Sequence, residues 1–600
     1  MPGGNPFNWL DALVASCLLP LALFILINGL DDLILDAAVA WSWLQGRRAG
    51  RLAGESRRDG APVPEKRLAI FVPLWREHEV IAGMVGHNMA AIRYRNYDFF
   101  IGAYPNDDLT LHAVRELEQR YSNVHLAVCA HDGPTSKADC LNWIYQRMLL
   151  FEDERDARFD VVVTHDAEDL IHPDSLAEIN RWAGDYQMVQ IPVLPLPTSL
   201  RDVIRGVYCD EFAEYQNKDI PARQILGAFL PSNGVGTGFT RAALEKLASR
   251  HRNQIFDPVC LTEDYENGLR LHRHGFRQKF VRLNPGPDPV ATRELFPPTL
   301  RAAIRQRTRW ITGISLQSWA IDGWRGGLSQ RYWFWRDRKG LLANPAGMFA
   351  NILFAYGVLT WVLAHCAGCA WALGRHAPHP AIFAAILTLQ LFHLGIRVLC
   401  VRAHFGWRFA SLVPLRMVLG NFINCIATLR AEYRFLRAKL LHEPLAWLKT
   451  DHAYPSRAAL LPHKRRLGEI LTGSAYVAED ALQRALATQQ PGVRLGEHLV
   501  SLGLLSEDDL YEALGLQHGL DAGPLAAAAV KRRVARALPR AIAMRWKVLP
   551  FRIAGGAMDI ASSEIPSEEV TRVLRSHTSL ELRFHLVTPT NFSELSEAML

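Results

Sequence analysis

The sequence predicts an α/β domain with a mostly parallel sheet, joined to membrane-spanning helices and followed by a smaller carboxyl-terminal module. Three observations lead to this expectation. Short buried-strand patterns alternate with helix-like stretches, long uncharged runs follow them, and a 24-residue segment recurs near the carboxyl end. A chain of 600 residues is also too long for one hydrophobic core, so two or more domains are expected.

Four apolar segments have the pattern of buried strands. They span residues 67–74, 99–103, 124–129 and 161–164, and they alternate with helix-like stretches such as 111–120 and 140–148. This alternation favours a mostly parallel α/β sheet. Ligands of open parallel sheets bind at the carboxyl ends of the strands, so the polar residues that directly follow a strand are the candidate site residues.

The residues after the second and fourth predicted strands are acidic. Residues 106–108 read Asn-Asp-Asp, and residues 165–169 read His-Asp-Ala-Glu-Asp. Carboxylates one residue apart on a strand-end turn can both face a hard cation, and that cation can hold a diphosphate. A solvated acidic turn is the alternative interpretation of either segment taken alone.

The uncharged runs predict helices that cross a membrane. Residues 340–374 and 376–396 are each long enough to span a hydrocarbon core of about 30 Å. Near the amino end, residues 13–27 form a shorter apolar run. Asp31 and Asp32 are expected to end this helix, and residues 33–44 are expected to lie in the membrane interface. No Lys or Arg precedes Arg47, so this run is interpreted as a retained helix rather than a cleaved signal peptide.

Charge placement predicts the topology and excludes some partners. Five arginines follow within residues 47–58, and the positive-inside rule therefore places the chain after residue 45 in the cytoplasm. The net charge of +7 is mild, and the basic residues flank the membrane segments, so nucleic-acid binding has little support. Nine cysteines are scattered along the chain, which predicts a reducing compartment rather than a disulfide framework.

A third apolar run, residues 417–429, has only 13 uncharged residues. A helix lying in the membrane plane is favoured over a spanning one, because runs of this length are typical of interfacial or buried helices. An apolar stripe at helical spacing supports this interpretation. It consists of Val418, Phe422, Ile426, Leu429 and Tyr433.

Several sequence blocks between residues 66 and 310 occur in an order that resembles a known family. They are Pro73 to Glu77 (PLWRE), 137–142 (KADCLN), 165–169 (HDAED), 235–239 (VGTGF), 262–264 (TED) and 306–310 (QRTRW). Together they resemble the processive family 2 glycosyltransferases with a GT-A fold, the group of cellulose and chitin synthases. The resemblance implies a single inverting displacement at the anomeric carbon of a nucleotide-sugar.

The resemblance also implies roles for individual residues. Asp264 is similar to the general base, and Asp166 with Glu168 would hold Mg²⁺ or Mn²⁺. The family usually has Asp-x-Asp at this point, so whether Glu168 or Asp169 is the second ligand stays open. Other positions resemble family residues that bind the nucleotide-sugar, namely Pro73, Glu77, Asp107, Lys137 and Asp166. The positions that resemble acceptor-binding residues are Gly236, Thr237, Gly238 and Trp310. The positions that resemble the residues closing the site are Gln306, Arg309 and Trp310.

Near the carboxyl end, residues 466–489 align with residues 494–517 at an offset of 28. Both copies begin Arg-Leu-Gly-Glu and close on Gln, and duplication of this kind marks a repeated supersecondary unit. The pair resembles the tandem motif of MshEN domains, which are α+β modules that bind cyclic di-GMP. The resemblance implies ligand binding by Arg466, Leu467, Gly468, Gln489, Arg494, Leu495, Gly496 and Gln517, and a docking module is the alternative.

The combination of domains resembles the phage-adsorption protein B (NfrB) family, in which the enzyme works with an outer-membrane partner in export of an N-acetylhexosamine glycan. The resemblance implies a multi-pass protein of the bacterial inner membrane that uses a UDP-sugar and answers to cyclic di-GMP as an activator. Transfer of one sugar to a lipid carrier is an alternative, as is a non-enzymatic membrane receptor or scaffold on a transferase fold.

The predicted division of the chain follows from these observations. Residues 1–60 form a transmembrane and interfacial helix, 61–338 the GT-A catalytic domain, and 339–404 two transmembrane helices. Residues 405–460 form an amphipathic interfacial helix and a candidate gating segment, with 447–452 placed where synthases of this group carry a gating loop. Residues 461–600 form the MshEN-like domain.

Overall fold

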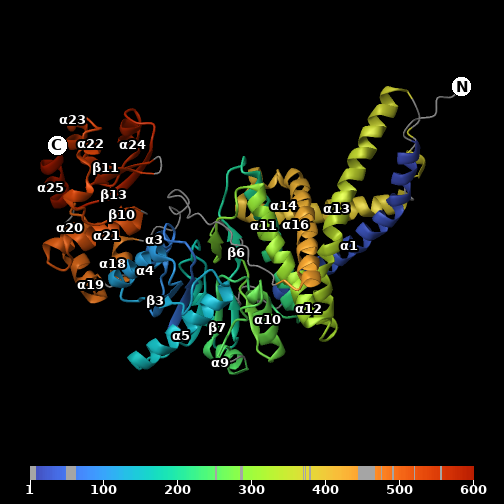
Figure 1. The fold of residues 1–600 in the computed structure, drawn as a ribbon, viewed down its shortest axis with the longest axis horizontal. Coiled ribbons are helices and arrows are strands. Elements are labelled where there is room, and N and C mark those ends of the chain that lie inside the picture. Colours follow the sequence, from blue (N-terminus) through green and yellow to red (C-terminus); the bar gives the residue numbers. More distant parts are fainter. Residues whose placement is uncertain are drawn as a thin grey trace. The chain divides into compact units, whose positions relative to one another are not determined.

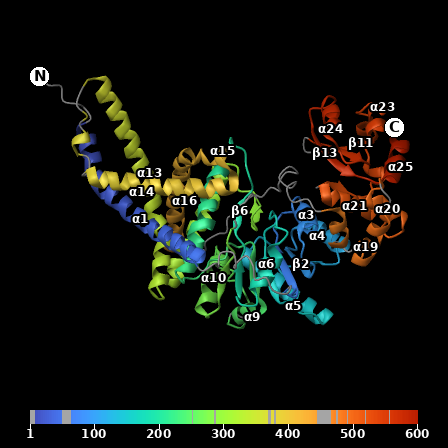
Figure 2. The same cartoon turned by 180° about the vertical axis from the view of Figure 1, so that it is seen from behind.

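A computed structural model describes residues 8–48, 63–250, 253–283, 288–368, 371, 373–376, 380–443, 466–473, 476–489, 492–518, 520–554 and 557–600. The chain forms two compact units. The first comprises the described parts of residues 1–78, 96–118 and 122–453, and the second those of residues 79–95, 119–121 and 454–600. Figures 1 and 2 show the fold from opposite sides.

The first unit contains a seven-stranded sheet in the order β3-β2-β1-β4-β7-β5-β8. The first four of these strands are parallel to one another, and β7 runs antiparallel to both β4 and β5. Their bounds are β1 (Leu68–Pro73), β2 (Tyr97–Ala103), β3 (Val124–Val128), β4 (Val161–Thr164), β5 (Met188–Gln190), β7 (Thr237–Thr240) and β8 (Gln278–Phe280). The four strands predicted from sequence are therefore confirmed, within two residues at each end.

Strands β1, β2 and β4 are buried on both faces, which is why their sequences are continuous apolar runs rather than alternating ones. Helix α5 (Lys137–Arg155) packs on β1 and β2 and supplies much of the core around Phe71, Phe100 and Phe239. Ser136 begins α5 by accepting a hydrogen bond from Asp139 N at 3.3 Å. The remaining elements before the membrane helices are α4 (Asp108–Arg120), α5 (Lys137–Arg155), α6 (Ser175–Trp182), β6 (Val193–Pro195), α7 (Val203–Glu214), the π-helix η1 (Tyr215–Asp219), α8 (Ile220–Ile225), α9 (Arg241–Arg250), α10 (Glu263–Arg273), β9 (Thr292–Glu294), α11 (Leu300–Ile311), the π-helix η2 (Thr312–Gln317) and α12 (Ser318–Asp322).

Three helices in the described part of the chain are long and apolar enough to cross a membrane. They are α1 (Asn8–Arg48), α13 (Leu328–Cys366) and α14 (Pro380–Phe405), and Figure 2 shows them beside one another. Short helices η3 (Leu373–His376) and α15 (Trp407–Ala410) precede and follow α14. Helix α16 (Val413–Leu441) contains the predicted in-plane run and is not among the candidate spans.

Helix α16 buries one side against α7, α11 and α13. Three members of the predicted stripe, Val418, Leu429 and Tyr433, are more than half exposed on its other side. The interfacial interpretation of α16 therefore stays a prediction that its exposed apolar face supports. The predicted gating segment, residues 447–452, lies outside the described residues.

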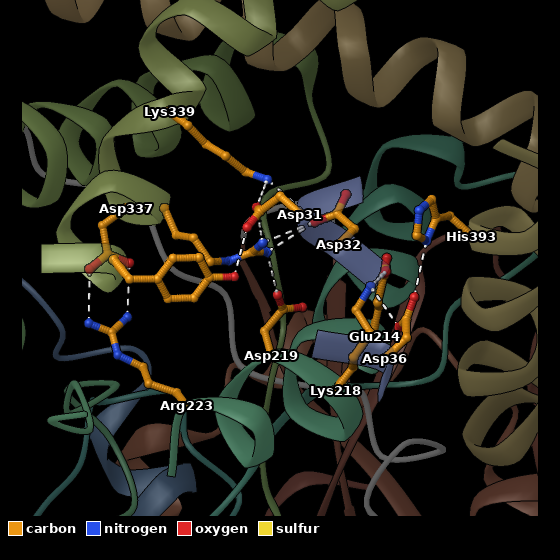
Figure 3. A network of polar contacts seen from close by, with 12 residues as sticks. Asp31, Asp32, Asp36, Glu214, Lys218, Asp219, Arg223, Asp337, Lys339 and His393 are labelled. Carbon is orange, nitrogen blue, oxygen red and sulfur yellow. Dashed lines mark hydrogen bonds and ion pairs between the residues drawn. The ribbon is translucent and has the colours of Figure 1, made fainter. Parts of the chain in front are cut away.

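The expectation that Asp31 and Asp32 end the first helix is wrong, because α1 continues through both residues to Arg48. Cations from α13 compensate these carboxylates. Arg336 pairs with both, Lys339 Nζ lies 2.7 Å from Asp31 Oδ2, and the Tyr332 hydroxyl donates to Asp31 Oδ1 at 2.7 Å. Figure 3 shows Lys339 reaching this carboxylate pair. Apolar helices tolerate charged side chains when partners neutralise them.

A second part of the same network lies between α1, η1 and α14. Lys218 Nζ donates to Glu214 Oε1 at 2.5 Å and lies 3.7 Å from Asp36 Oδ1. Arg397 Nε donates to the other Glu214 oxygen at 2.5 Å, and His393 Nδ1 lies 3.2 Å from Asp36 Oδ2. The network thus connects two membrane helices to the helices that follow β6 in the catalytic unit (Figure 3).

The second unit contains α3 (Ile81–Ala91), four helices from the sequence repeats and a four-stranded sheet in the order β10-β13-β12-β11. Each repeat folds into a pair of helices, and Gly496 lets the second pair approach closely, because a Cβ there would lie 2.4 Å from Leu510 Cδ1. The bounds are α18 (Leu467–Gly473), α19 (Glu479–Thr488), α20 (Leu495–Ser501), α21 (Glu507–His518), β10 (Asp521–Ala522), η5 (Ala527–Ala529), α22 (Arg532–Ala535), α23 (Arg540–Trp546), β11 (Val548–Ala554), β12 (Ala557–Ser562), α24 (Glu568–Arg575), β13 (Glu581–Leu586) and α25 (Pro589–Met599).

The buried network makes a stability prediction. Arg336→Met should lower the free energy of unfolding by about 3–5 kcal/mol, because it removes the buried cation that pairs with Asp31, Asp32 and Asp219. Arg158→Met is the matched control, since its pair with Glu245 is exposed and is worth at most about 1 kcal/mol. Chemical denaturation of the full chain in detergent measures both, and equal losses would contradict the role given to the network.

Candidate active site

A cavity with about 1070 Å³ of empty volume, including space open to solvent, lies at the carboxyl ends of β1, β2 and β4. This is the edge at which open parallel sheets bind ligands. The lining of the cavity includes nine residues predicted from sequence: Pro73, Glu77, Lys137, Asp166, Glu168, Asp264, Gln306, Arg309 and Trp310.

Lys137 and Asp166 form an ion pair in the lining of the cavity. Asp166 follows β4, Lys137 begins α5, and Lys137 Nζ lies 2.5 Å from Asp166 Oδ1. Burial disfavours the charged amine, but the carboxylates of Asp166 and Glu263 outweigh this effect and raise the pKa of Lys137 above its ordinary value. Lys137 is therefore a fixed positive charge in the cavity.

The turn after β4 separates the roles of Glu168 and Asp169. Glu168 lines the cavity, whereas Asp169 is fully buried and is absent from the lining. Asp169 Oδ2 accepts from Asp166 N at 3.0 Å and lies 2.7 Å from His165 Nδ1. Burial, together with the charges of Asp166 and Glu168, raises the pKa of Asp169 well above its ordinary value. This geometry favours Glu168 as the second candidate metal ligand and gives Asp169 the role of holding the turn.

Asp264 and Glu263 lie in the first turn of α10, next to Lys137. Asp264 Oδ1 accepts from Tyr265 N at 2.8 Å. Burial raises the pKa of Asp264, and burial together with the Asp264 charge raises the pKa of Glu263 to about 7. Gly234 has a φ of +78°, and a Cβ at this position would lie 2.8 Å from Asp264 Oδ2. Glycine therefore leaves room for the Asp264 carboxylate.

Helix α11 presents the predicted closing residues on one side. Gln306, Arg309 and Trp310 are spaced by three and four residues, which places them on one helix face, and all three line the cavity. The opposite side is anchored by Arg307, whose NH1 donates to Glu211 Oε2 at 2.6 Å and to Asn424 Oδ1 at 2.5 Å. Contacts with α7 and α16 thus fix the rotation of α11.

Four predicted site residues lie away from the cavity wall. Asp107 Oδ2 accepts from Arg76 N at 2.6 Å and holds that residue at a φ of +56°. Thr237 Oγ1 donates to Gln190 Oε1 at 2.7 Å inside the sheet. A Cβ at Gly236 would lie 2.5 Å from Thr292 Oγ1, and one at Gly238 would lie 2.5 Å from Ile179 Cγ2. Each of these residues shapes the turns and strands behind the cavity.

Sequence reasoning missed other lining residues. Trp75 and Tyr104 follow β1 and β2, and their rings meet edge-on with centroids 5.4 Å apart. Both residues follow a strand, as Asp166 does, but their side chains are aromatic, whereas the strand-end rule selects polar residues. Glu263 and Glu294 are further carboxylates of the lining.

The cavity is strongly acidic. Among the described lining residues, two cationic side chains, Lys137 and Arg309, face six carboxylates: Glu77, Asp166, Glu168, Glu263, Asp264 and Glu294. No group of three or more His, Cys, Asp or Glu within the described residues is arranged to hold a metal ion by itself. Mg²⁺ in phosphate-binding sites commonly uses one or two carboxylates and completes its coordination with substrate oxygens, so Asp166 and Glu168 fit such a site.

The predicted ligand residues of the second unit fall into three groups. Arg466 and Arg494 are exposed and directly precede α18 and α20, at equivalent positions of the two repeats. Leu467 and Leu495 pack against the core of this unit, and Gly468 and Gly496 are in close contact with Leu482 and Leu510. Gln489 Nε2 donates to Val493 O at 2.7 Å, and Gln517 lies near the end of α21.

Comparison with known proteins agrees with both units. Residues 64–313 match the family described as "Glycosyltransferase like family 2", and residues 518–599 match the MshEN domain. The second match begins directly after the second repeat. The fold, the cavity and these matches define the chain as a membrane-associated glycosyltransferase of the family 2 type.

The sequence is 34% identical over 599 residues to "Bacteriophage adsorption protein B" of Escherichia coli K12, a match that covers 93% of this chain and 78% of that protein. "Bacteriophage N4 adsorption protein B" of E. coli O157:H7 matches equally. The chain therefore belongs to the bacteriophage adsorption protein B family.

Among solved structures, a mannosyltransferase from Pyrobaculum calidifontis in complex with GDP-Man and Mn²⁺ is 18% identical. It covers 68% of this chain and 99% of its own, with a TM-score of 0.36. A structure of MshE with cdg is 26% identical and covers 23% of this chain and 100% of its own, with a TM-score of 0.21.

Proposed function

We propose that this protein is an inverting glycosyltransferase that uses a UDP-N-acetylhexosamine to synthesise and export a glycan at the bacterial inner membrane. The observation that carries the proposal is the convergence of Asp166, Lys137, Asp264 and the α11 face on one cavity. These residues come from separate parts of the sequence. Together they supply a base, a place for a diphosphate and a wall for an acceptor sugar.

In the proposed reaction an acceptor hydroxyl oxygen attacks the anomeric carbon while the bond from that carbon to the diphosphate oxygen breaks. Asp264 takes the hydroxyl proton, and its raised pKa brings it closer to neutrality, where a general base works best. The leaving diphosphate carries away the bonding electron pair. Lys137 and Arg309 face the negative charge that develops on it.

A divalent cation fits this chemistry because the lining has an excess of carboxylates, and a diphosphate would otherwise meet strong repulsion. Asp166 and Glu168 would hold Mg²⁺ or Mn²⁺, which would stabilise the charge on the departing diphosphate. The intact acid residues argue against a scaffold that has lost catalysis. The wall formed by Gln306, Arg309 and Trp310 favours a polymerising enzyme over transfer of one sugar to a lipid carrier, and product length discriminates between them.

Regulation by cyclic di-GMP is the second part of the proposal. The two repeats place Arg466 and Arg494 at matching, exposed helix starts, which suits a ligand with two similar halves and two phosphodiester charges. The MshEN match adjoins these repeats. Binding alters catalysis only if the ligand prefers the active arrangement of the protein, so cyclic di-GMP is proposed as an allosteric activator. An outer-membrane export partner is proposed from the family relationship alone.

The catalytic roles predict different losses for two variants. Asp264→Asn should retain UDP-N-acetylglucosamine binding but lower turnover by about 10²–10⁴-fold, because only the base is removed. Asp166→Ala should weaken donor binding, because it removes a metal ligand. Asp257→Asn is the control, an exposed carboxylate outside the cavity lining. UDP release and donor calorimetry on the full chain measure both effects, and normal turnover by Asp264→Asn would refute the assignment.

Cyclic di-GMP should bind the full chain at micromolar concentration and raise the rate of UDP release. Arg494→Ala should weaken this binding by about 10- to 100-fold, because a charge-assisted hydrogen bond is worth roughly 1.5–3 kcal/mol. It should leave the basal rate unchanged. Arg583→Ala, an exposed arginine outside the repeats, should bind normally. Absence of binding heat in the unsubstituted chain would rule out the regulatory proposal.

The proposed topology places the amino end outside and both catalytic and MshEN domains in the cytoplasm. It rests on the arginines that follow the first span and on the three candidate spans. A reporter that is active only in the periplasm, fused after residue 455, should therefore give no signal. A strong signal from that fusion would contradict the topology.

A further inference from the structure

The carboxylate of Asp264 is oriented by the residue that follows it. Because Asp264 Oδ1 accepts from Tyr265 N at 2.8 Å, its direction depends on where the Tyr265 backbone lies. The Tyr265 side chain is 3% exposed, and its ring packs edge-to-face against Phe229 with centroids 5.2 Å apart. Its hydroxyl donates to Asp337 Oδ2 on α13 at 2.7 Å. The residue is therefore fixed at both its backbone and its hydroxyl.

Asp337 is itself held rigidly. Arg223 donates from both terminal nitrogens to the two Asp337 carboxylate oxygens, each at 2.9 Å, as Figure 3 shows. Arg223 is 2% exposed, its Nε donates to Phe229 O at 2.8 Å, and its guanidinium lies 4.2 Å from the Phe229 ring centroid. A buried bidentate pair of this kind has little freedom to rotate. The Tyr265 hydroxyl thus has an acceptor at a fixed point.

Asp337 and the preceding residue, Arg336, also contact two other parts of the catalytic unit. Ser315, on the η2 segment that continues α11, donates from Oγ to Asp337 O at 2.7 Å. The preceding residue, Arg336, pairs with Asp32 of α1 and with Asp219 of η1, both at 3.1 Å. Polar contacts at one turn of α13 therefore join the Asp264 helix, the helix bearing the closing residues and a membrane helix.

We propose that Tyr265 and Asp337 are positioning residues for glycosyl transfer, which aim the Asp264 carboxylate from an anchor on membrane helix α13. The inference rests on the proposed role of Asp264 as the base. Neither residue is among the described residues that line the cavity, so donor contacts with Asp166 and Lys137 do not depend on them directly. Loss of the hydroxyl should therefore affect the chemical step, where small misplacements of a catalytic group are costly.

The test is Tyr265→Phe, which removes one hydroxyl and keeps the ring that packs on Phe229. Tyr332→Phe is a matched control, because Tyr332 on α13 also donates to a carboxylate, Asp31 Oδ1, at 2.7 Å. The full chain in lipid nanodiscs is assayed with UDP-N-acetylglucosamine and MnCl₂ for kcat and KM. Calorimetry with UDP and MnCl₂ then measures nucleotide binding separately from turnover.

Tyr265→Phe should lower kcat at least 10-fold, with KM and the UDP Kd within about twofold of the unsubstituted chain. Tyr332→Phe should leave all three within twofold. A normal kcat for Tyr265→Phe would overturn the inference, as would an equal loss of kcat in Tyr332→Phe. The Asp264→Asn variant distinguishes failure of this inference from failure of the proposed function. If the proposed function is wrong, Asp264→Asn turns over normally. If only this inference is wrong, Asp264→Asn still loses turnover while Tyr265→Phe does not.

Discussion

Repulsion among the carboxylates of the cavity is the constraint on which the catalytic unit depends. Among the described residues, six acidic side chains and two basic ones line this cavity, and burial weakens the screening that water would provide. Burial is the main cause of the raised pKa values of Glu263 and Asp264, and neighbouring carboxylates add to it: Asp264 raises the pKa of Glu263, and Asp166 raises that of Asp264. Lys137 offsets part of the charge, because it pairs with Asp166 and lowers the pKa of Asp264. In the proposed function, a donor diphosphate would need further positive charge in order to bind, which would link metal binding to donor binding.

The first membrane helix also carries buried carboxylates, and cations from other helices compensate their charge. Asp31, Asp32 and Asp36 lie on a helix of otherwise apolar character, and cations of α13 and η1 neutralise them within the protein. Because these partners belong to segments on either side of the catalytic α10 and α11, the network fixes the first membrane helix to the transferase. Asp337 directly follows Arg336, which belongs to this network. The orientation of the Asp264 carboxylate is therefore coupled to the position of the membrane helices.

Local patterns were sufficient to predict the four parallel strands and the acidic turn after β4, whereas Asp264 and the α11 residues of the cavity were predicted from the family resemblance. A buried parallel strand has a continuous apolar sequence, and its carboxyl end is placed by the sheet itself, so Asp166 could be located without coordinates. Features that depend on distant partners could not be found in this way. The continuation of α1 through Asp31 depends on Arg336 and Lys339, about 300 residues away in sequence.

Turn geometry also decides details that sequence spacing leaves open. Glu168 and Asp169 are adjacent carboxylates, and only the hydrogen bonds to Asp166 N and His165 assign Asp169 to the turn rather than the cavity. Gly236 and Gly238 resemble an acceptor block, yet their close contacts with Thr292 and Ile179 give them a packing role. Contacts with tightly packed neighbouring side chains account for these differences. A sequence pattern does not contain this spatial information.

Nucleotide release is the decisive measurement of metal-dependent glycosyl transfer from a nucleotide-sugar. The full chain in lipid nanodiscs is offered a panel of UDP-, GDP- and dTDP-sugars with MgCl₂ or MnCl₂, and then with EDTA. We expect release of UDP from a UDP-N-acetylhexosamine with either metal and loss of that release in EDTA. No release from any donor, or release at the same rate in EDTA, would contradict it.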